Sequence, residues 1–147
     1  MKKSDFPLLV VEDSPDDAAF IRRAFEKANL KNPLVLVSDA EGAEAFLLGK
    51  SPYEGRILPA MILLDVRLPG RSGLEILQWL RKQKDFSHIP VVVLSGSEDP
   101  AVVNRAYECG ANSYVSKNDL ATEVLAERVR GLLTYWLESN HPRHSKP

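Results

Sequence analysis

Five short apolar runs alternate along the chain with longer segments whose apolar residues recur at helical spacing. The runs are rich in Leu and Val, which is typical of strands buried on both faces of a sheet. They occupy Leu8–Val11, Pro33–Val37, Met61–Leu64, Val91–Leu94 and Ser113–Val115. The alternation therefore predicts an α/β fold, a doubly wound sheet of five parallel strands with helices on both faces.

Polar and turn residues mark the helices expected between the strands. A serine or aspartate that can accept a hydrogen bond from the first turn precedes several of these segments, and Glu75, three residues after Ser72, completes a capping box. The expected helices run from Ser14 to about Asn29, over about residues 41–48, onward from Ser72, from Asp99 to Gly110, and from Asp119 to about Leu137.

The last expected helix closes the predicted domain. Its apolar stripe consists of Leu125, Val129, Leu132, Leu133 and Trp136. Because Tyr135, Trp136 and Leu137 are consecutive, they cannot all face one core, which predicts exposed apolar area and an interface. We expect one folded domain over residues 5–138 and a disordered tail over residues 139–147.

Composition narrows the classes of function. A chain of 147 residues, 44% hydrophobic and 27% charged, suits one globular domain. The net charge of -1 gives no reason to expect nucleic acid or an anionic membrane as partner. The apolar run near the N-terminus is too short for a signal peptide or a membrane span, so we expect a cytoplasmic protein. The single Cys109 excludes an internal disulfide and a thiolate metal cluster.

Charged and hydroxyl side chains follow the carboxyl ends of four strands. Glu12 and Asp13 follow the first strand, Asp65 the third, Ser95 the fourth and Lys117 the fifth. Doubly wound sheets bind ligands outside these ends, where the strand order reverses. Three carboxylates, a hydroxyl and an ammonium are therefore expected to converge in one crevice.

Carboxylates brought so close together repel one another unless a cation neutralises them. The candidate ligands are all hard oxygens, which favours Mg²⁺, with Mn²⁺ as the alternative, over zinc. Magnesium keeps several ligand positions for other oxygens, which implies a phosphate-bearing partner that Lys117 and Ser95 would contact. Asp65, left accessible by the turn at residues 69–73, is then a candidate nucleophile that forms an acyl phosphate.

Four motifs at these strand ends resemble the receiver domains of two-component response regulators, the CheY-like family. They are VVEDSPDD, LLDVRLPGRSGLE, VVVLSGS and GANSYVSK. The resemblance covers about Pro7 to Leu137 and implies a flavodoxin-like sheet in the order 2-1-3-4-5. The NPLVLVSDAEGAEAFL and YWLES segments are most similar to stand-alone regulators paired with phytochrome-type histidine kinases.

The resemblance implies a phosphoacceptor and a metal site. Asp65 would accept a phosphoryl group from the phosphohistidine of a partner kinase. Mg²⁺ would be bound by Glu12, Asp13, Asp65 and the backbone carbonyl of Arg67. Such a protein is a regulator rather than an enzyme, because it catalyses only its own phosphotransfer and dephosphorylation.

The resemblance also implies a switch. Lys117 would pair with the phosphoryl group, Ser95 would be the switch hydroxyl, and Tyr114 the switch aromatic on the fifth strand. The signal would leave through the fourth helix, fifth strand and fifth helix, to a downstream protein or a phosphotransfer partner. Similarity to the phytochrome-linked subgroup favours a homodimer through this face.

Two positions depart from the family pattern. Receivers usually have a proline joined by a cis bond after the lysine, whereas Asn118 follows Lys117 here. A cis bond to a non-proline residue costs roughly 2.5–4 kcal/mol. The sequence therefore does not determine the conformation of this loop or whether the Lys117 side chain reaches Asp65. Arg67 also places a cation two residues after Asp65, where its side chain would either contact the phosphoryl group or obstruct attacking water.

Other functional classes use related residues in different patterns. A haloacid-dehalogenase-like phosphatase would have a second acid at the position of Arg67, and a nucleotide-binding domain would offer a glycine-rich phosphate loop. The strongest alternative is a receiver-like interaction module with an inert site, which Asn118 favours and the intact acidic site opposes.

Other polar residues have structural explanations. Asp16 and Asp17 are interpreted as a solvated acidic start to a helix, favoured by its dipole. Tyr114 also suits an ordinary half-buried strand position. His141 and His144 are expected to be tail residues rather than ligands.

Overall fold

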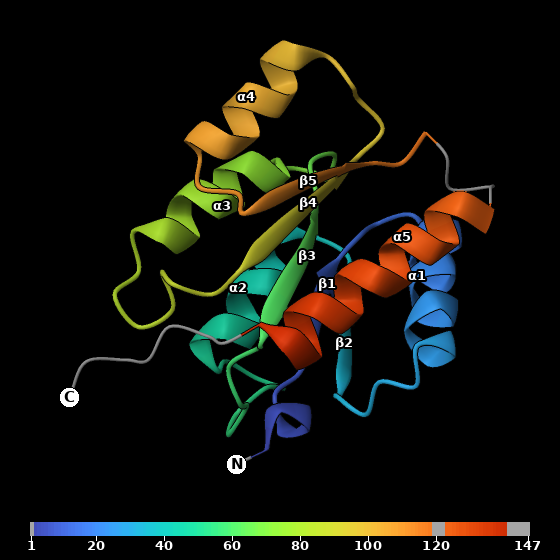
Figure 1. The fold of residues 1–147 in the computed structure, drawn as a ribbon. Helices are drawn as coiled ribbons and strands as arrows, with labels where there is room; N and C mark the ends of the chain where they lie inside the picture. The colour runs from blue at the N-terminus through green and yellow to red at the C-terminus, as the bar shows by residue number, and fades with distance from the viewer. Residues whose placement is uncertain (1, 119–122, 141–147) are drawn as a thin grey trace.

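The computed structural model describes residues 2–118 and 123–140, with the backbone alone at residues 123–126, 128 and 129. Five parallel strands form one sheet in the order β2-β1-β3-β4-β5 (Figure 1), which confirms the predicted fold class and strand order. The strands are β1 (Leu8–Val11), β2 (Leu34–Val37), β3 (Met61–Asp65), β4 (Val91–Ser95) and β5 (Ser113–Ser116).

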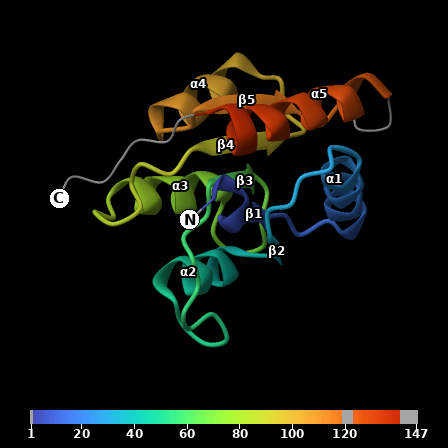
Figure 2. The same ribbon diagram turned by 60° about the horizontal axis from the view of Figure 1, so that its bottom comes forward.

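Helices cover both faces of this sheet. They are α1 (Pro15–Lys27), α2 (Ala40–Leu48), α3 (Gly73–Arg81), α4 (Pro100–Glu108) and α5 (Glu123–Thr134), preceded by a 3₁₀ turn, η1 (Lys3–Asp5), and followed by a π-helical turn, η2 (Tyr135–Ser139). Figure 2 shows β5 at the edge of the sheet with α4 and α5 beside it. These three elements form the face that was expected to carry the output.

Alternation along the strands divides the core in two. In β1, Leu8 and Val10 belong to one apolar cluster, which includes residues of α1 and α5. Leu9 and Val11 belong to the other, which includes residues of α2, α3 and α4. Successive side chains of a strand point to opposite faces, so a strand buried on both faces must be apolar throughout.

Side-chain caps account for most of the helix starts. Ser14, Ser72 and Asp99 each accept a hydrogen bond from a backbone N–H of the first turn, as predicted. Asp39 caps α2 in the same way, although the sequence analysis had not identified it. The predicted cap Asp119 lies outside the described residues.

The end of the last helix differs from the prediction. Regular α-helix stops at Thr134, and the π-helical turn η2 carries helical structure through Ser139, which had been assigned to the tail. Leu133 and Leu137 are buried, whereas Tyr135 is 52% exposed, so the consecutive apolar residues do divide between core and surface. The side chains of Leu125 and Val129, and residues 141–147 of the predicted tail, lie outside the described part.

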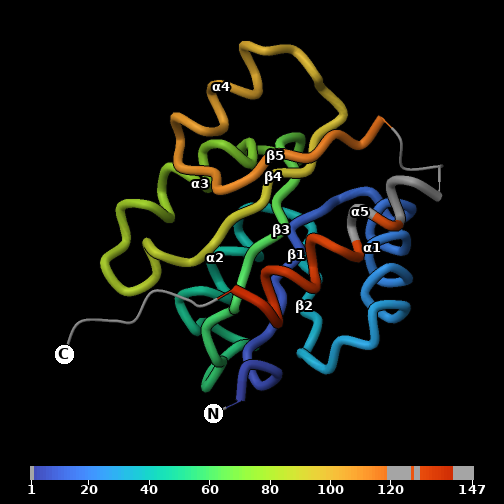
Figure 3. The backbone as a smooth tube through the Cα atoms, viewed as in Figure 1, coloured from blue at the N-terminus to red at the C-terminus, as the bar shows by residue number. Residues whose placement is uncertain are grey.

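The N-terminal segment contacts the end of this helical region. Lys3 Nζ donates a hydrogen bond of 2.8 Å to the carbonyl oxygen of Glu138, so η1 and η2 lie at the same end of the molecule (Figure 3). Asn32, which is buried, donates to the carbonyl oxygens of Lys3 and Phe6 and fixes the path of this segment. Within the described residues, no helix combines the length and apolar character that crossing a membrane requires.

Candidate functional site

Strand register places two acidic residues beside each other. Val11 of β1 pairs with Leu64 of β3, so Glu12, which follows β1, and Asp65, which ends β3, are neighbours at the carboxyl edge of the sheet. Both are buried, with 6% and 5% of their surfaces exposed. A pair of buried carboxylates is costly unless a cation or a proton compensates their charge.

The remaining strands bring a hydroxyl and an amine to the same edge. Asp65 pairs with Leu94, so Ser95 lies one residue farther along β4. Ser95 pairs in turn with Ser116, which puts Lys117 directly after the end of β5. The backbone N–H of Lys117 donates to the carbonyl oxygen of Ser95 at 2.6 Å and extends the pairing by one step.

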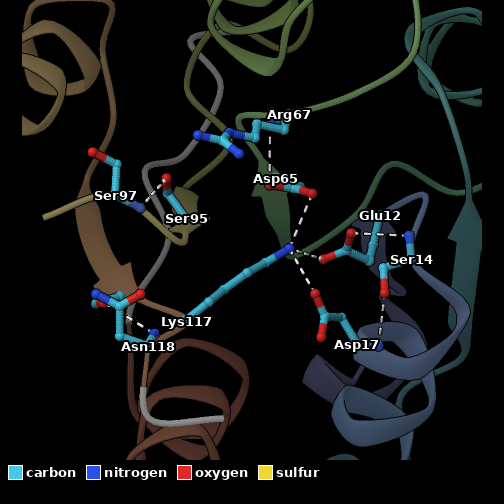
Figure 4. Close-up of polar contacts among 10 residues, drawn as sticks. Glu12, Ser14, Asp17, Asp65, Arg67, Ser95, Ser97, Lys117 and Asn118 are labelled. Atoms are coloured by element: carbon cyan, nitrogen blue, oxygen red, sulfur yellow. Dashed lines mark hydrogen bonds and ion pairs between the residues drawn. The ribbon is translucent and has the colours of Figure 1, made fainter.

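The ammonium of Lys117 lies among three carboxylates (Figure 4). Its Nζ is 2.6 Å from Glu12 Oε1, 2.9 Å from Asp17 Oδ2 and 3.0 Å from Asp65 Oδ2. The lysine side chain is only 13% exposed, so water screens these attractions weakly. One cation is therefore shared among three acids that belong to different elements.

The crowding shifts the pKa of two groups. Burial raises the pKa of Glu12 to about 7, and the neighbouring Asp65 raises it further, while contact with Lys117 lowers it. For Lys117, burial alone would lower the pKa, but the contacts with Glu12, Asp17 and Asp65 outweigh burial and raise it above its ordinary value. The lysine is therefore charged at neutral pH.

The acidic group fits a divalent cation. Glu12, Asp13 and Asp65 each offer a carboxylate oxygen, and these oxygens lie within 4.8 Å of one another. The buried Oε1 of Glu12 already lies 2.6 Å from the Lys117 ammonium, so this oxygen is one that a positive charge stabilises. Asp13 is exposed, so the site is open to solvent on that side. All-oxygen donor sets suit Mg²⁺ or Mn²⁺.

The chain after Asp65 folds back on the carboxylate. The backbone N–H of Arg67 donates to Asp65 Oδ1 at 3.1 Å, so this peptide lies next to the acidic group. The side chain of Arg67 is exposed and forms no ion pair within the described part of the chain. Its carbonyl remains the expected fourth protein ligand of a metal.

A close backbone approach forms the turn after Asp65. Gly70 has φ of 76°, a conformation that favours glycine. At Gly73, a Cβ would collide with the carbonyl oxygen of Asp65. Arg71 lies between these glycines, and its guanidinium contacts Glu44 of α2 at 2.6 Å. The turn singled out in the sequence thus holds the loop against Asp65. The expectation that this turn leaves Asp65 accessible is wrong, because the residue is only 5% exposed.

Ser95 and Tyr114 are connected through the loop after β4. Ser95 Oγ accepts a hydrogen bond of 3.1 Å from the backbone N–H of Ser97. The Tyr114 hydroxyl donates to the carbonyl oxygen of the same Ser97 at 2.6 Å. Ser95 is buried and Tyr114 is half-buried. Both side chains therefore contact the loop that leads into α4 through the backbone of Ser97.

Lys117 reaches the site without a cis bond after it. The cis peptide bond in the described residues joins Ser51 to Pro52, so the Lys117–Asn118 bond is trans. The Asn118 backbone N–H donates to Ser116 Oγ at 3.1 Å and shapes the turn instead. The question that Asn118 raised about the reach of Lys117 is answered by the 3.0 Å contact with Asp65.

One member of the site, Asp17, was not predicted from the sequence. Asp17 had been assigned to a solvated helix start, yet its carboxylate accepts a hydrogen bond of 2.9 Å from Lys117 Nζ. Its place in the sequence was the available signal, because Asp17 lies in the first turn of α1, three residues after the cap Ser14 and close to the carboxyl end of β1. Asp16, which is exposed, remains consistent with the original interpretation.

Fold and site together define a member of the response regulator receiver domain family, and the model of that family matches residues 8–130. Response regulator Rcp1 of Synechocystis sp. is 33% identical to the chain over 132 residues, which cover 90% of this chain and 89% of Rcp1. A probable methanogenesis regulatory protein, FilR2 of Methanothrix harundinacea, is 37% identical over 135 residues, covering 92% and 86% of the two chains.

Solved structures give the same relationship. The crystal structure of the Mn²⁺-bound form of response regulator Rcp1 superposes with a TM-score of 0.83 at 31% identity. That of the phosphorylated cyanobacterial phytochrome response regulator RcpA superposes with a TM-score of 0.86 at 29% identity. Each comparison covers 95% of this chain and 99% of the other. The chain is thus a receiver domain related to phytochrome response regulators.

Proposed function

We propose that this receiver accepts a phosphoryl group on Asp65 from the phosphohistidine of a sensor histidine kinase, as one step of a two-component phosphorelay. The observation that carries the proposal is the position of the Asp65 carboxylate, which is 3.0 Å from Lys117 Nζ and belongs to a group of three acids spanning 4.8 Å. A nucleophilic carboxylate, a fixed cation and a metal-binding acidic group are what transfer to a carboxylate requires.

The chemical step moves one phosphoryl group. An oxygen of Asp65 attacks the phosphorus, the P–N bond to the donor imidazole breaks, and an acyl phosphate forms on Asp65. Lys117 binds an oxygen of the transferring group and stabilises its charge, and Ser95 donates a hydrogen bond to another. Hydrolysis of the acyl phosphate by water returns the free carboxylate and ends the signal.

The acidic residues are proposed to bind a divalent cation. Glu12, Asp13, Asp65 and the backbone carbonyl of Arg67 would hold Mg²⁺ or Mn²⁺, and the cation would neutralise repulsion between the carboxylates and an incoming phosphate. The donor chemistry of the three acids supports this, as does the relative Rcp1, whose structure has been solved with Mn²⁺.

The output is proposed to pass through α4, β5 and α5. Phosphate would draw Ser95 inward and release Ser97, and Tyr114 would follow, which shifts the equilibrium between two arrangements of the loop and α4. The exposed Tyr135, which directly follows α5, supports a homodimer there. The recipient is a downstream protein or a phosphotransfer partner, and the kinase is of phytochrome type by similarity to RcpA.

The proposal places the protein in the cytoplasm, with the receiver domain spanning residues 5–138, and the family match over residues 8–130 supports that extent. The alternative is a receiver-like module that binds partners without phosphorylation. That alternative has the departure at Asn118 in its favour, and the assembled carboxylates and Lys117 oppose it.

Intact mass spectrometry after incubation with acetyl phosphate tests the proposal. With Mg²⁺, the wild-type protein should gain the mass of one phosphoryl group, and chelation of the metal should abolish the gain. Asp65→Asn should gain none, because the amide is a poor nucleophile. Asp16→Asn, which changes an exposed acid near the site, is the matched control and should be phosphorylated like the wild type.

Failure of the wild type to gain phosphate in any condition would support the inert module. Phosphate on Asp65→Asn would show that another residue is the acceptor. Either result would overturn the proposal, whereas the expected pattern would direct attention to the identity of the kinase.

A further inference from the structure

Three carboxylates contact the Lys117 ammonium, but they are not equivalent. Glu12 and Asp65 belong to the acidic group that fits a cation, and Asp17 lies outside that group. Asp17 comes from α1, on the opposite side of the ammonium from Asp65 in Figure 4. Its contact with Lys117, at 2.9 Å, is as short as the contact that Lys117 makes with Asp65.

The backbone around Lys117 does not determine where its ammonium goes. Two local hydrogen bonds hold this turn, from the Lys117 N–H to the Ser95 carbonyl and from the Asn118 N–H to Ser116 Oγ. Neither touches the flexible four-carbon side chain beyond Cα. The carboxylates around Nζ therefore select the direction of the side chain, and Asp17 is one of the three.

A metal and the lysine compete for the same acids. A cation bound by Glu12 and Asp65 would repel the Lys117 ammonium, which lies 2.6 Å from one carboxylate and 3.0 Å from the other. If these were the lysine's sole partners, metal binding would leave a buried ammonium without a counter-charge, which is costly. Asp17 supplies a counter-charge for the Lys117 ammonium and is not one of the carboxylates grouped for the metal.

We propose that Asp17 is a positioning residue, which holds the Lys117 ammonium on the α1 side of the site so that Glu12 and Asp65 can bind a divalent cation while the lysine stays within reach of the phosphoryl group. The inference rests on the proposed function and deepens it, since it assigns to Asp17 a role that acts through Lys117. The anchoring of Asp17 supports this role, because its backbone N–H donates to the cap Ser14 at the start of α1.

Calorimetric titration with MgCl₂ in the absence of any phosphodonor tests the inference. Asp17→Asn keeps the size of the side chain and removes its charge, and we expect its Mg²⁺ dissociation constant to rise about fivefold. Asp16→Asn removes an equal charge from the neighbouring residue, which is exposed. We expect its dissociation constant to stay within about twofold of the wild type.

A double-mutant cycle distinguishes an effect of Asp17 that acts through Lys117 from the direct electrostatic attraction between the Asp17 carboxylate and Mg²⁺. In a Lys117→Met background, Asp17→Asn should weaken Mg²⁺ binding no more than Asp16→Asn does, because the residue through which Asp17 acts is gone. Far-UV circular dichroism of each variant establishes that it is folded. Equal effects of Asp17→Asn in the two backgrounds would overturn the inference, as would equal effects of Asp17→Asn and Asp16→Asn on the wild type.

The wild-type titration distinguishes the two proposals. Wild-type protein that binds no Mg²⁺ and gains no phosphate would overturn both the proposed function and the role of Asp17. Wild-type protein that binds Mg²⁺ and gains phosphate, while Asp17→Asn behaves like Asp16→Asn, would overturn the role of Asp17 alone.

Discussion

The Tyr114 hydroxyl donates a 2.6 Å hydrogen bond to the carbonyl oxygen of Ser97. The N–H of Ser97 donates to Ser95 Oγ, so one residue of the β4–α4 loop is held from both sides. In the proposed switch, movement of the Ser95 hydroxyl toward a phosphoryl group would break the second contact and free the loop to follow Tyr114. A hydrogen-bonded path of three residues thus joins the proposed phosphate site to the loop that leads into α4.

Tyr114→Phe should weaken that connection while preserving most of the packing. The variant loses a hydrogen bond worth about 1 kcal/mol, so we expect faster amide exchange over residues 96–103 and a smaller change there on phosphorylation. Hydrogen exchange with and without acetyl phosphate measures both. Tyr107→Phe is the control, because Tyr107 is 47% exposed on α4 and should respond like the wild type. An unchanged response in Tyr114→Phe would exclude the path.

The pKa of Glu12 gives the metal-free protein a characteristic pH dependence. Its folded-state pKa of about 7 exceeds the ordinary value of 4.5, so the folded protein binds this proton more tightly than the unfolded chain. The resulting stability is complete below pH 4.5 and is lost as the pH rises through 7. Asp65 and Lys117 face Glu12 from β3 and the end of β5, and Asp13 follows it in the chain.

Urea unfolding in EDTA at several pH values measures this loss. We expect the free energy of unfolding of the wild type to fall by about 3 kcal/mol at most between pH 5 and pH 8, relative to Glu12→Gln, which has no proton to lose. Glu26→Gln, at an exposed position of α1, should keep the wild-type slope. Parallel curves for the wild type and Glu12→Gln would contradict the prediction.

The close approach at Gly73 makes this position intolerant of a side chain. A Cβ there collides with the Asp65 carbonyl, and backbone is less able to yield than a side chain, so Gly73→Ala should destabilise the protein by about 2–4 kcal/mol. We also expect slower phosphorylation, because the clash displaces Asp65. Thermal unfolding and intact mass measure the two effects.

Gly131 provides the matched substitution. It lies in α5, where an added Cβ would meet nothing within 4 Å, so Gly131→Ala should stabilise the protein by about 0.5–1 kcal/mol. If Gly73→Ala were as stable as Gly131→Ala, the contact between Gly73 and Asp65 would not constrain the loop.

Arg81 is predicted to be a major source of stability far from the acidic site. Its guanidinium donates to the carbonyl oxygens of Ser87, Ile89 and Gly110, at distances between 2.7 and 3.0 Å. Burial lowers the pKa of Arg81. Arg81→Met leaves these carbonyls without a donor and should cost about 3 kcal/mol in urea unfolding. Lys82→Met, at the next and exposed position, should cost less than about 0.5 kcal/mol.

Much of the fold follows from local sequence. Each strand begins or ends within one residue of the predicted apolar run, because a strand buried on both faces must be apolar throughout its length. The caps Ser14, Ser72 and Asp99 are also local, since a cap bonds to a backbone N–H two or three residues away. The missed cap Asp39 belongs to the same local class and was recoverable from sequence.

The sequence predicts which residues gather at the acidic site, but not how all of their side chains are directed. Once the strands are parallel and ordered 2-1-3-4-5, Glu12 and Asp65 have to meet at the carboxyl edge, because their strands pair directly. The direction of a long side chain does not follow from that order. The 2.9 Å contact between Lys117 and Asp17 joins residues 100 positions apart and depends on how α1 packs against the sheet.

The sequence by itself therefore determined the elements, their order and the residues that gather at one edge of the sheet, since periodicity, caps and strand pairing act over short distances or by simple topology. Only the tertiary structure decided that Asp17 shares the Lys117 ammonium, that Tyr114 bonds to Ser97, and that Arg81 holds the Gly110 carbonyl. Each of these contacts depends on the packing of a helix or loop against the sheet, and such packing depends on the whole core rather than on any one segment.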